Sequence, residues 1–230
     1  MTSPPPPSPP APVPAAVPAA RPRAVVESCT RLAAPAYVPE VRLRVAAEVF
    51  GLWERTGRLP YWAFAWAGGL ALARHVLDHP DLVAGRTVLD LASGSGLVAI
   101  AAARAGAASV IAADIDPLAG AAIALNAEAN DVRVTVLLHD LLADPPGPEP
   151  GAETAEVVLA GDVFYERPLA ERVMAYLENA RRRGAEVVVG DPDRAYLPRR
   201  RFARLGTHRV PESGLLEAEE VKPATVWRLP

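Results

Sequence analysis

A glycine-rich turn lies between two acidic residues near the middle of the chain. Asp90 ends an apolar run and precedes Gly94 and Gly96, while Asp114 ends a second apolar run 18 residues after Gly96. This spacing predicts a strand, a tight turn, a helix and a second strand, which is half of a nucleotide-binding βαβ unit. Glycines let a backbone approach its ligand closely, and a carboxylate after the second strand can hold a ribose diol through charge-assisted hydrogen bonds. The chemistry indicated is therefore nucleotide binding.

Two kinds of nucleotide fit this turn. Residues 94–99 match the loose form of the dinucleotide fingerprint, and Asp114 lies at a workable distance from it. A carboxylate at Asp90, however, is poorly placed beside a pyrophosphate and well placed to organise the turn and meet a cationic amino-acid group. The run from Asp90 to Gly96 resembles the first motif of class I S-adenosylmethionine-dependent methyltransferases, which usually carry glycine where Ala92 stands. The resemblance implies S-adenosyl-L-methionine as cofactor, and Ala92 is expected to avoid a positive φ.

Further matches to this class follow the later predicted strands. Residues 113–117 look like its second motif, Asp140 sits where the class often contacts the adenine amino group, and residues 161–165 end a fourth strand where the acceptor atom is received. From the residues alone, Asp140 could instead cap a turn, and Asp116 before Pro117 could cap a helix. The cofactor-binding residues that the resemblance implies are Trp66, Asp90, Ala92, Gly94, Gly96, Asp114, Ile115, Asp140 and Leu141.

The overall composition argues against several classes of function. A net charge of −3 does not suggest a nucleic-acid partner, and no apolar run is long enough to span a membrane. The only cysteine, Cys29, excludes an internal disulfide and suits a reducing compartment. With 230 residues, no candidate metal-ligand cluster and no surplus apolar helix, the chain is expected to be a cytoplasmic monomer without a metal site.

The N-terminal third differs in composition from the rest. Residues 1–22 hold ten of the 25 prolines and predict a disordered tail, because such a segment cannot build a hydrogen-bonded ladder or a core. Residues 23–80 are expected to form a lid in which apolar residues recur at helical spacing over 39–55 and four of the six residues 61–66 are aromatic. These aromatic side chains could pack on the core or wall the cofactor, and Trp66 could do both.

From residue 81 to residue 230 apolar strands alternate with helices, which predicts a mainly parallel sheet with helices on both faces. The expected strands are 87–91, 109–114, 132–138, 155–161, 185–190, 206–211 and 223–229, and the expected helices are 70–77, 96–106, 117–130, 167–183 and a short one near 198–204. The fold class predicted is a Rossmann-like α/β class I methyltransferase, with a seven-stranded sheet, a C-terminal antiparallel hairpin and an N-terminal helical and aromatic lid.

One family resembles the chain well beyond the cofactor turn. The matching stretches are Pro60–Ala63, Trp66–Gly69, Asp90–Gly96, Asp114–Pro117, Gly161–Tyr165, Gly190–Pro192 and Ala224–Trp227, which together span about residues 40–229. They resemble the electron transfer flavoprotein β-subunit lysine methyltransferases, within the seven-β-strand protein methyltransferases. Ala67, where the family usually has proline, and Ala92 depart from the pattern, and neither removes a chemical group.

The resemblance implies methyl transfer from S-adenosyl-L-methionine to lysine side chains of the electron transfer flavoprotein β-subunit. Asp162 is expected to accept a hydrogen bond from the amine and to stabilise developing positive charge, with the Tyr165 hydroxyl as a second acceptor. Phe164 and Trp62 are expected to wall the lysine channel. By residue type alone, Asp162 could be a turn residue after a strand, and Phe164 could belong to the core.

Other functions stay open on the sequence. The acceptor could be a small-molecule amine or a ribosomal protein lysine, which the cofactor-binding residues do not distinguish. A nicotinamide-dependent oxidoreductase lacks support because Lys222 is the only lysine and forms no Tyr-x-x-x-Lys pair. A non-catalytic adaptor that recruits partners through the proline-rich tail is disfavoured by the intact Asp90, Asp114 and Asp162.

Overall fold

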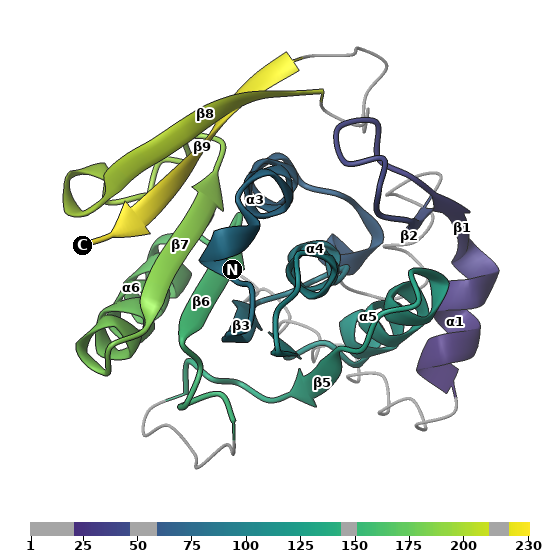
Figure 1. Cartoon of the computed structure of the whole chain (residues 1–230). Helices are drawn as coiled ribbons and strands as arrows, with labels where there is room; N and C mark the ends of the chain where they lie inside the picture. The colour runs from purple at the N-terminus through teal and green to yellow at the C-terminus, as the bar shows by residue number, and fades with distance from the viewer. Residues whose placement is uncertain (1–20, 47–58, 144–150, 212–220) are drawn as a thin grey trace, which may run out of the picture.

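A seven-stranded sheet runs through the centre of the molecule in the strand order β5-β4-β3-β6-β7-β9-β8 (Figure 1). The structure is a computed structural model that describes residues 21–46, 59–143, 151–211 and 221–230. The strands are β3 (Thr87–Leu91), β4 (Ser109–Asp114), β5 (Thr135–Leu138), β6 (Val157–Gly161), β7 (Glu186–Asp191), β8 (Ala203–Pro211) and β9 (Val221–Leu229). Strands β3 to β7 pair in parallel, and β9 pairs antiparallel with β7 and β8, which confirms the predicted fold class.

Helices cover both faces of this sheet. They are α1 (Arg21–Cys29), α3 (Ala67–Asp78), α4 (Leu97–Arg104), α5 (Pro117–Ala129) and α6 (Arg167–Arg182), with the short 3₁₀ turns η1 (Tyr61–Ala63), η2 (Pro80–Leu82) and η3 (Arg199–Arg201). Successive strand residues alternate between the faces, so Val88 packs in the core with α3 and α4, whereas Leu89 packs in the core with α6. No helix in the described ranges is long and apolar enough to cross a membrane.

The register of the sheet brings its functional loops together. Asp90 of β3 pairs with Leu159 of β6, and Gly161 at the end of β6 pairs with Gly190 of β7. Because parallel strands share one direction, the loops that follow β3, β4, β6 and β7 all leave the sheet at its carboxyl edge. The predicted strand ends of β3 and β4 agree with the structure residue for residue. The predicted helix near 198–204 is limited to the 3₁₀ turn η3, because β8 begins at Ala203.

The helix predicted over 39–55 is wrong where the structure describes it. Residues Leu43–Ala46 form strand β2, which pairs antiparallel with β1 (Thr30–Ala33) in a separate two-stranded sheet. Side chains of α5 hold this segment in its extended form: Asn126 accepts the N–H of Arg44 at 2.7 Å and Asn130 accepts the N–H of Arg42 at 2.9 Å. Residues 47–55 lie outside the described residues.

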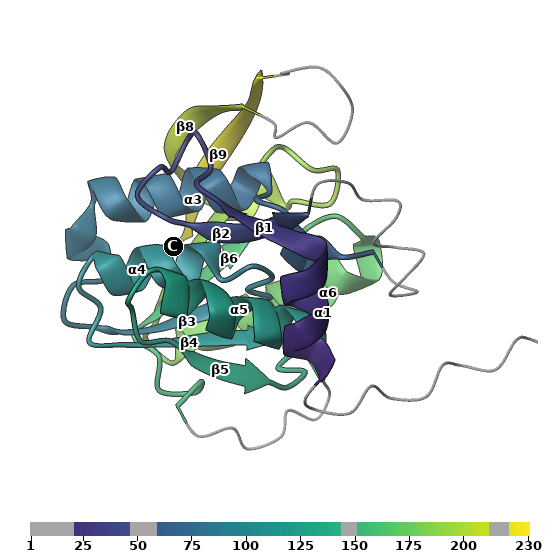
Figure 2. The same ribbon diagram turned by 90° about the vertical axis from the view of Figure 1, so that its right-hand side faces the viewer.

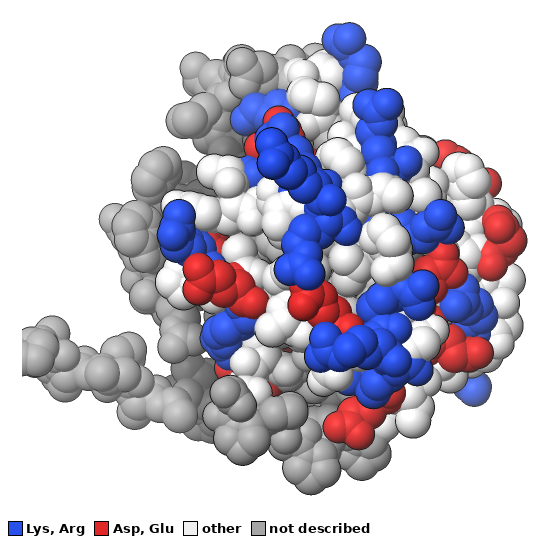
Figure 3. All heavy atoms as spheres, turned by 90° about the vertical axis from the view of Figure 1, so that its left-hand side faces the viewer, with Lys and Arg blue, Asp and Glu red and all other residues white. Residues whose placement is uncertain are grey.

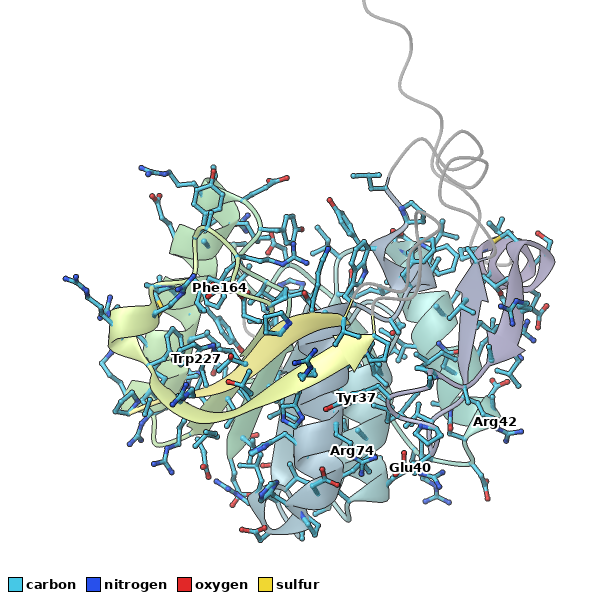
Figure 4. All side chains as sticks on the ribbon, turned by 90° about the horizontal axis from the view of Figure 1, so that it is seen from above. Tyr37, Glu40, Arg42, Arg74, Phe164 and Trp227 are labelled. Carbon is cyan, nitrogen blue, oxygen red and sulfur yellow. The ribbon has the colours of Figure 1, made fainter. Side chains whose placement is uncertain are left out.

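The described part of the predicted lid consists of elements that lie beside α5 and of a helix that packs on the main sheet. Helix α1 begins at Arg21, inside the predicted tail, while residues 1–20 lie outside the described residues. Figure 2 shows α1 against α5, with β1 and β2 beside them. Helix α3, by contrast, packs on the sheet with Leu70 and Leu72 buried in the main core. An ion pair of 2.6 Å between Arg74 of α3 and Glu40 joins the two parts (Figure 4). Residues 23–80 as a distinct lid stay a prediction.

Candidate active site

The glycine-rich turn after β3 is organised by Asp90. Its carboxylate oxygen Oδ2 accepts the Ser93 hydroxyl at 2.5 Å and the Ala99 N–H of α4 at 3.0 Å. Only 1% of Asp90 is exposed, and this burial raises its pKa to about 7 against the opposing effect of the two hydrogen bonds. Asp90 therefore fixes the turn to the first residues of α4. This is the first of its two expected roles, the organisation of the turn. Its direct contact with a cationic ligand stays a prediction.

The expectation for Ala92 is wrong. Its φ is +54°, in the left-handed region that disfavours residues with a Cβ atom, as are those of Gly94 (+57°) and Gly96 (+82°). The turn therefore keeps the backbone path that glycine usually takes at this position, and alanine is accommodated with strain on the order of 1–2 kcal/mol. The Ala92 side chain is exposed, so its methyl group meets no steric barrier from the core.

Asp114 lies at the end of β4 and faces the same turn. Its Oδ2 accepts the N–H of Gly94 at 2.9 Å, and its Oδ1 accepts the N–H of Asp116 at 3.0 Å. Each carboxylate oxygen has a further lone pair, so a ribose diol can still be held there. Ile115 beside it is 65% exposed and offers an apolar surface. Asp116 accepts the N–H of Leu118 at 2.8 Å, which makes it the N-cap of α5.

The backbone of this turn is open to contact with a ligand at Gly94. A Cβ built on Gly94 would meet only the Cα of Trp62, at 3.9 Å, so the turn is uncovered at this residue. The turn combines backbone N–H groups, a carboxylate at the end of the next strand and the exposed Ile115. This donor and acceptor set fits a nucleoside that carries an amino-acid group, as S-adenosyl-L-methionine does.

Asp140 and Leu141 follow β5 in a tight turn. Asp140 accepts the N–H of Leu142 at 2.9 Å through Oδ1 and forms an ion pair of 2.7 Å with Arg172 of α6 through Oδ2. Leu141 is buried, and its N–H donates to the His139 carbonyl oxygen at 3.1 Å. The turn-capping alternative for Asp140 is therefore present in the structure. The contact of these two residues with an adenine ring stays a prediction.

An aromatic cluster stands beside the site. The Trp66 indole N–H donates to the Tyr61 carbonyl oxygen at 2.8 Å, and the Tyr61 ring lies 5.9 Å from the Trp66 ring and 5.3 Å from the Tyr165 ring, between centroids. Burial raises the pKa of Tyr165 to about 12, so its hydroxyl stays protonated at neutral pH. The cluster thus connects the segment before α3 with the loop after β6. The sequence placed Tyr61 among the aromatic residues that could wall the cofactor, but Tyr61 was not named as a site residue of its own.

The two expected channel residues, Trp62 and Phe164, are buried, and their role in a lysine channel stays a prediction. Trp62 is 1% exposed and packs with Val26 of α1 and Leu125 of α5. Phe164 is fully buried, lies on the same side of the molecule as α6 (Figure 4) and contacts the Phe202 ring edge-to-face at 6.1 Å. Both side chains therefore pack in the core, as the alternative interpretation of Phe164 held.

Asp162 follows β6 with φ of +59° and is 8% exposed. Its Oδ2 accepts the N–H of Gly69 in the first turn of α3 at 2.7 Å, and its Oδ1 forms an ion pair of 2.9 Å with Arg194. Burial raises the pKa of Asp162, while Arg194 and the backbone N–H groups of α3 oppose that shift. Sequence reasoning missed Arg194 and its neighbour Asp191, although Asp191 lies in the matching stretch Gly190–Pro192.

A separate pocket lies at the opposite edge of the sheet. Its volume is about 550 Å³ and its lining includes Arg86, Arg181, Glu186 and Arg228. Glu186 is the first residue of β7, so the pocket is at the amino edge of the parallel strands and does not adjoin the glycine-rich turn. Figure 3 shows basic and acidic side chains interspersed on the side of the molecule that carries α6 and the C-terminal strands. The pocket has no part in the site described above.

Comparisons with known proteins support the fold and the class of cofactor. The family model for ribosomal protein L11 methyltransferase (PrmA) matches residues 72–179. A magnesium protoporphyrin IX methyltransferase from Synechocystis PCC 6803, solved with its bound S-adenosyl-L-methionine, superposes with a TM-score of 0.50 at 17% identity over 78% of this chain and 94% of that chain. The likeness shows the fold of class I S-adenosyl-L-methionine-dependent methyltransferases.

Two full-length relatives are more similar in sequence. The electron transfer flavoprotein beta subunit lysine methyltransferase of Danio rerio is 34% identical over 89% of this chain and 81% of its own length. The human protein of the same name is 35% identical over 89% of this chain and 80% of its own length. The chain therefore belongs to the electron transfer flavoprotein beta subunit lysine methyltransferase family.

Proposed function

We propose that the protein transfers the methyl group of S-adenosyl-L-methionine to lysine side chains of the electron transfer flavoprotein β-subunit. The observation that carries the proposal is the position of Asp162 and Tyr165, which follow β6 directly beside the strand that leads into the glycine-rich turn. A carboxylate and a phenol at this edge supply two acceptors for an amine next to the expected cofactor site. The names of the relatives support the substrate.

The cofactor would be held by the turn and by the end of β4. Asp114 would accept hydrogen bonds from the ribose diol, and Ile115 would contact the adenine ring through its exposed side chain. Gly94 and Gly96 would let the backbone approach the amino-acid group closely. Trp66 would cover the site from the side of α3. When bound, the cofactor supplies a methyl group that its positive sulfonium already activates.

The protein has three tasks in such a transfer: to align the amine, to exclude water and to keep the amine neutral. Tyr61, Trp66 and Tyr165 form the apolar side of the site and would exclude water. The Tyr165 oxygen and the carboxylate of Asp162 would accept the N–H groups of the amine, so that the nitrogen lone pair points at the methyl group. Asp162 would also stabilise the positive charge that develops on nitrogen.

The protein is proposed to act in the cytoplasm as a monomer that takes no nucleic acid as a partner. These proposals rest on the composition, namely the net charge of −3 and the single cysteine. Electrostatic attraction to nucleic acid would require a basic stripe. The face in Figure 3 carries acidic side chains between its basic ones. Ion pairs such as Arg201–Glu178, at 2.6 Å, reduce the basic charge of the surface further.

The proposal is tested with purified protein, radiolabelled S-adenosyl-L-methionine and recombinant electron transfer flavoprotein. Label is expected on the β-subunit, and Asp162→Asn is expected to reduce the rate at least tenfold while cofactor affinity changes little. Asparagine keeps an oxygen for the Gly69 N–H, so helix α3 stays in place. Asp193→Asn is the matched control, since Asp193 is exposed, also has a positive φ and pairs with Arg199.

The acceptor is the part of the proposal that most needs a direct comparison. The match to the ribosomal protein L11 methyltransferase model favours ribosomal protein L11 as a second candidate acceptor. Equal amounts of L11 and of a small-molecule fraction are therefore assayed in parallel. Label on L11 or on small amines, with none on the flavoprotein, would keep the methyltransferase and replace the substrate.

A further inference from the structure

We propose that Arg194 partly balances the charge of Asp162, so that the pair accepts hydrogen bonds from a neutral lysine amine and favours the unreactive ammonium form less than an unpaired carboxylate would. Arg194 is thus a positioning and charge-balancing residue that acts through Asp162. The inference rests on the proposed function, because it concerns the acceptor amine of that reaction.

The first observation is the contact itself. The guanidinium Nη2 of Arg194 lies 2.9 Å from Oδ1 of Asp162, and 29% of the Arg194 side chain and 9% of the Asp162 side chain are exposed. An ion pair that is largely covered is weakly screened by solvent, unlike the surface pairs on this protein. A group bound next to Asp162 therefore experiences the combined electrostatic field of Asp162 and Arg194.

The second observation is that Arg194 is held in place from β7. The N–H of Arg194 donates to Oδ1 of Asp191 at 2.7 Å, and Asp191 is fully buried at the end of β7. The loop from Asp191 to Arg194 therefore returns the guanidinium to the end of the neighbouring strand β6. Among the described residues, the Nε atom of Arg194 and the Oδ2 atom of Asp191 are buried without a hydrogen-bond partner, so burying these two polar atoms costs desolvation energy.

The second oxygen of Asp162 also faces positive charge. Oδ2 accepts the N–H of Gly69 at 2.7 Å, in the first turn of α3, where the helix dipole is positive. Asp162 is thus held between a guanidinium and a helix N-terminus. Its remaining lone pairs are available to a ligand, since each carboxylate oxygen can accept two hydrogen bonds.

A second acidic group acts on this carboxylate: Asp191 of β7, whose pKa is raised by its own burial and by the charge of Asp162. Tyr61, Glu166 and Asp114 act on Tyr165, the other expected acceptor. Within the described ranges, Arg194 is the cationic side chain that the structure pairs with Asp162. Removing its charge therefore leaves Asp162 next to Asp191 without that balancing charge.

The consequence for catalysis follows from the chemistry of lysine. A free lysine has a pKa of about 10.4 and must lose a proton before its lone pair can attack. An unbalanced carboxylate favours the ammonium and raises the pKa of the amine further, which opposes the reaction. A carboxylate paired with Arg194 keeps its hydrogen-bond acceptors and loses a part of that effect, while the rest can still stabilise the positive charge that develops on nitrogen. Burial raises the pKa of Asp162 and Arg194 opposes that rise, which favours the ionised carboxylate.

The test is the pH profile of the methylation rate at saturating substrate, from pH 7 to pH 10.5, for wild type, Arg194→Gln and Arg194→Lys. In Arg194→Gln the rate at pH 7.5 is expected to fall about tenfold and to approach the wild-type rate at high pH, because one unit in the amine pKa corresponds to a factor of ten. Arg194→Lys keeps the charge and is expected to keep most of the wild-type profile.

Arg199→Gln is the matched control, since Arg199 is exposed and pairs with Asp193 rather than Asp162. It is expected to leave the profile unchanged. An Arg194→Gln enzyme that loses the same fraction of its rate at every pH would overturn the proposal, because a purely structural role predicts that result. Arg194→Met provides a second neutral side chain if the Gln variant melts early.

A second measurement separates this inference from the proposed function. The Asp162 carboxyl carbon is titrated by ¹³C NMR in wild type and in Arg194→Gln, and its signal is identified by its loss in Asp162→Asn. The carboxyl is expected to ionise at lower pH in wild type than in Arg194→Gln. Equal titration curves, or a wild-type Asp162 that is protonated at pH 7.5, would overturn the charge balance. A wild-type enzyme that methylates no lysine while the two curves differ would contradict the proposed function alone.

Discussion

Gly68 at the start of α3 and Gly190 near the end of β7 are in backbone contact. A Cβ atom built on Gly190 would overlap the Gly68 carbonyl oxygen and would lie 2.8 Å from the Cβ of Leu72. A Cβ atom on Gly68 would overlap the Gly190 carbonyl oxygen and lie 2.7 Å from Oδ2 of Asp162. The absence of side chains at both residues lets the first turn of α3 reach the carboxyl edge of the sheet. This approach is what delivers the Gly69 N–H to Asp162.

Gly68→Ala is therefore expected to destabilise the fold by about 1–3 kcal/mol, because the added methyl group meets backbone that cannot move aside. Gly69→Ala is the matched control, since a Cβ there would have only ordinary contacts, at 3.9 Å and 4.0 Å. The control is expected to be neutral or to stabilise the helix by up to about 1 kcal/mol. Urea denaturation of both variants is the measurement. Equal stabilities would contradict the close packing at Gly68.

Ala92→Gly is expected to stabilise the protein slightly, which is the reverse of the usual effect. The left-handed φ of Ala92 costs about 1–2 kcal/mol, and the extra unfolded-state entropy of glycine offsets about 0.5–1 kcal/mol of the gain. Ala124→Gly in α5 is the control and is expected to lose about 1 kcal/mol. Thermal melts of the two variants show whether the signs differ. A loss at residue 92 as large as at residue 124 would mean that Ala92 is unstrained.

Variants of Asp114 and Asp116 are expected to affect two different properties: cofactor affinity for Asp114 and protein stability for Asp116. Asp114→Ala removes the acceptor of the Gly94 N–H and of a ribose diol, so affinity for S-adenosyl-L-methionine should fall by about 1.5–3 kcal/mol. Asp116→Ala removes the N-cap of α5 and should cost about 1 kcal/mol of stability with little change in affinity. Titration calorimetry and melting curves measure the two effects. Unchanged affinity in Asp114→Ala would exclude its role toward the ribose.

The central strands of the sheet were predictable because they are buried on both faces. In β3 and β4, continuous apolar runs begin after a turn and end at an acidic residue, and such runs have few alternatives in a parallel α/β fold. Strand β2 was not predictable in the same way. The spacing of Val41 and Val45 fits a helical turn as well as every second position of a strand. The groups that decide between them, Asn126 and Asn130, lie more than 80 residues away.

The sequence was sufficient to predict which residues belong to the site, but it was not sufficient to predict their contacts. Asp90, Asp114 and Asp162 stand at strand ends, where the pattern placed them. The partner of Asp162 was not visible, because Arg194 follows another strand, 32 residues later. The orientation of the Phe164 side chain could not be predicted from its residue type either, since an aromatic residue after a strand can face a ligand or the core. Such choices depend on the packing of distant segments.

The buried Asp90 predicts a pH dependence of stability that a single variant can isolate. Its pKa is raised from an ordinary value of 3.8 to about 7 in the folded protein. Because the pKa is higher in the folded protein, protonated Asp90 contributes to the unfolding free energy, and this contribution is fully present below pH 3.8. That contribution is lost as the pH rises through 7. Over this window the unfolding free energy of wild type should fall by about 4 kcal/mol relative to a variant that carries no titrating group there.

Asp90→Asn is that variant, since its amide oxygen can still accept from Ser93 and Ala99. Without cofactor, the variant is expected to gain stability relative to wild type between pH 4 and pH 7 and to keep a constant difference above pH 8. The other titrating groups are common to both proteins, and the lowered pKa of His75 therefore cancels in the difference. A flat difference for Asp90→Asn would show that Asp90 ionises in the folded protein as readily as in the unfolded chain.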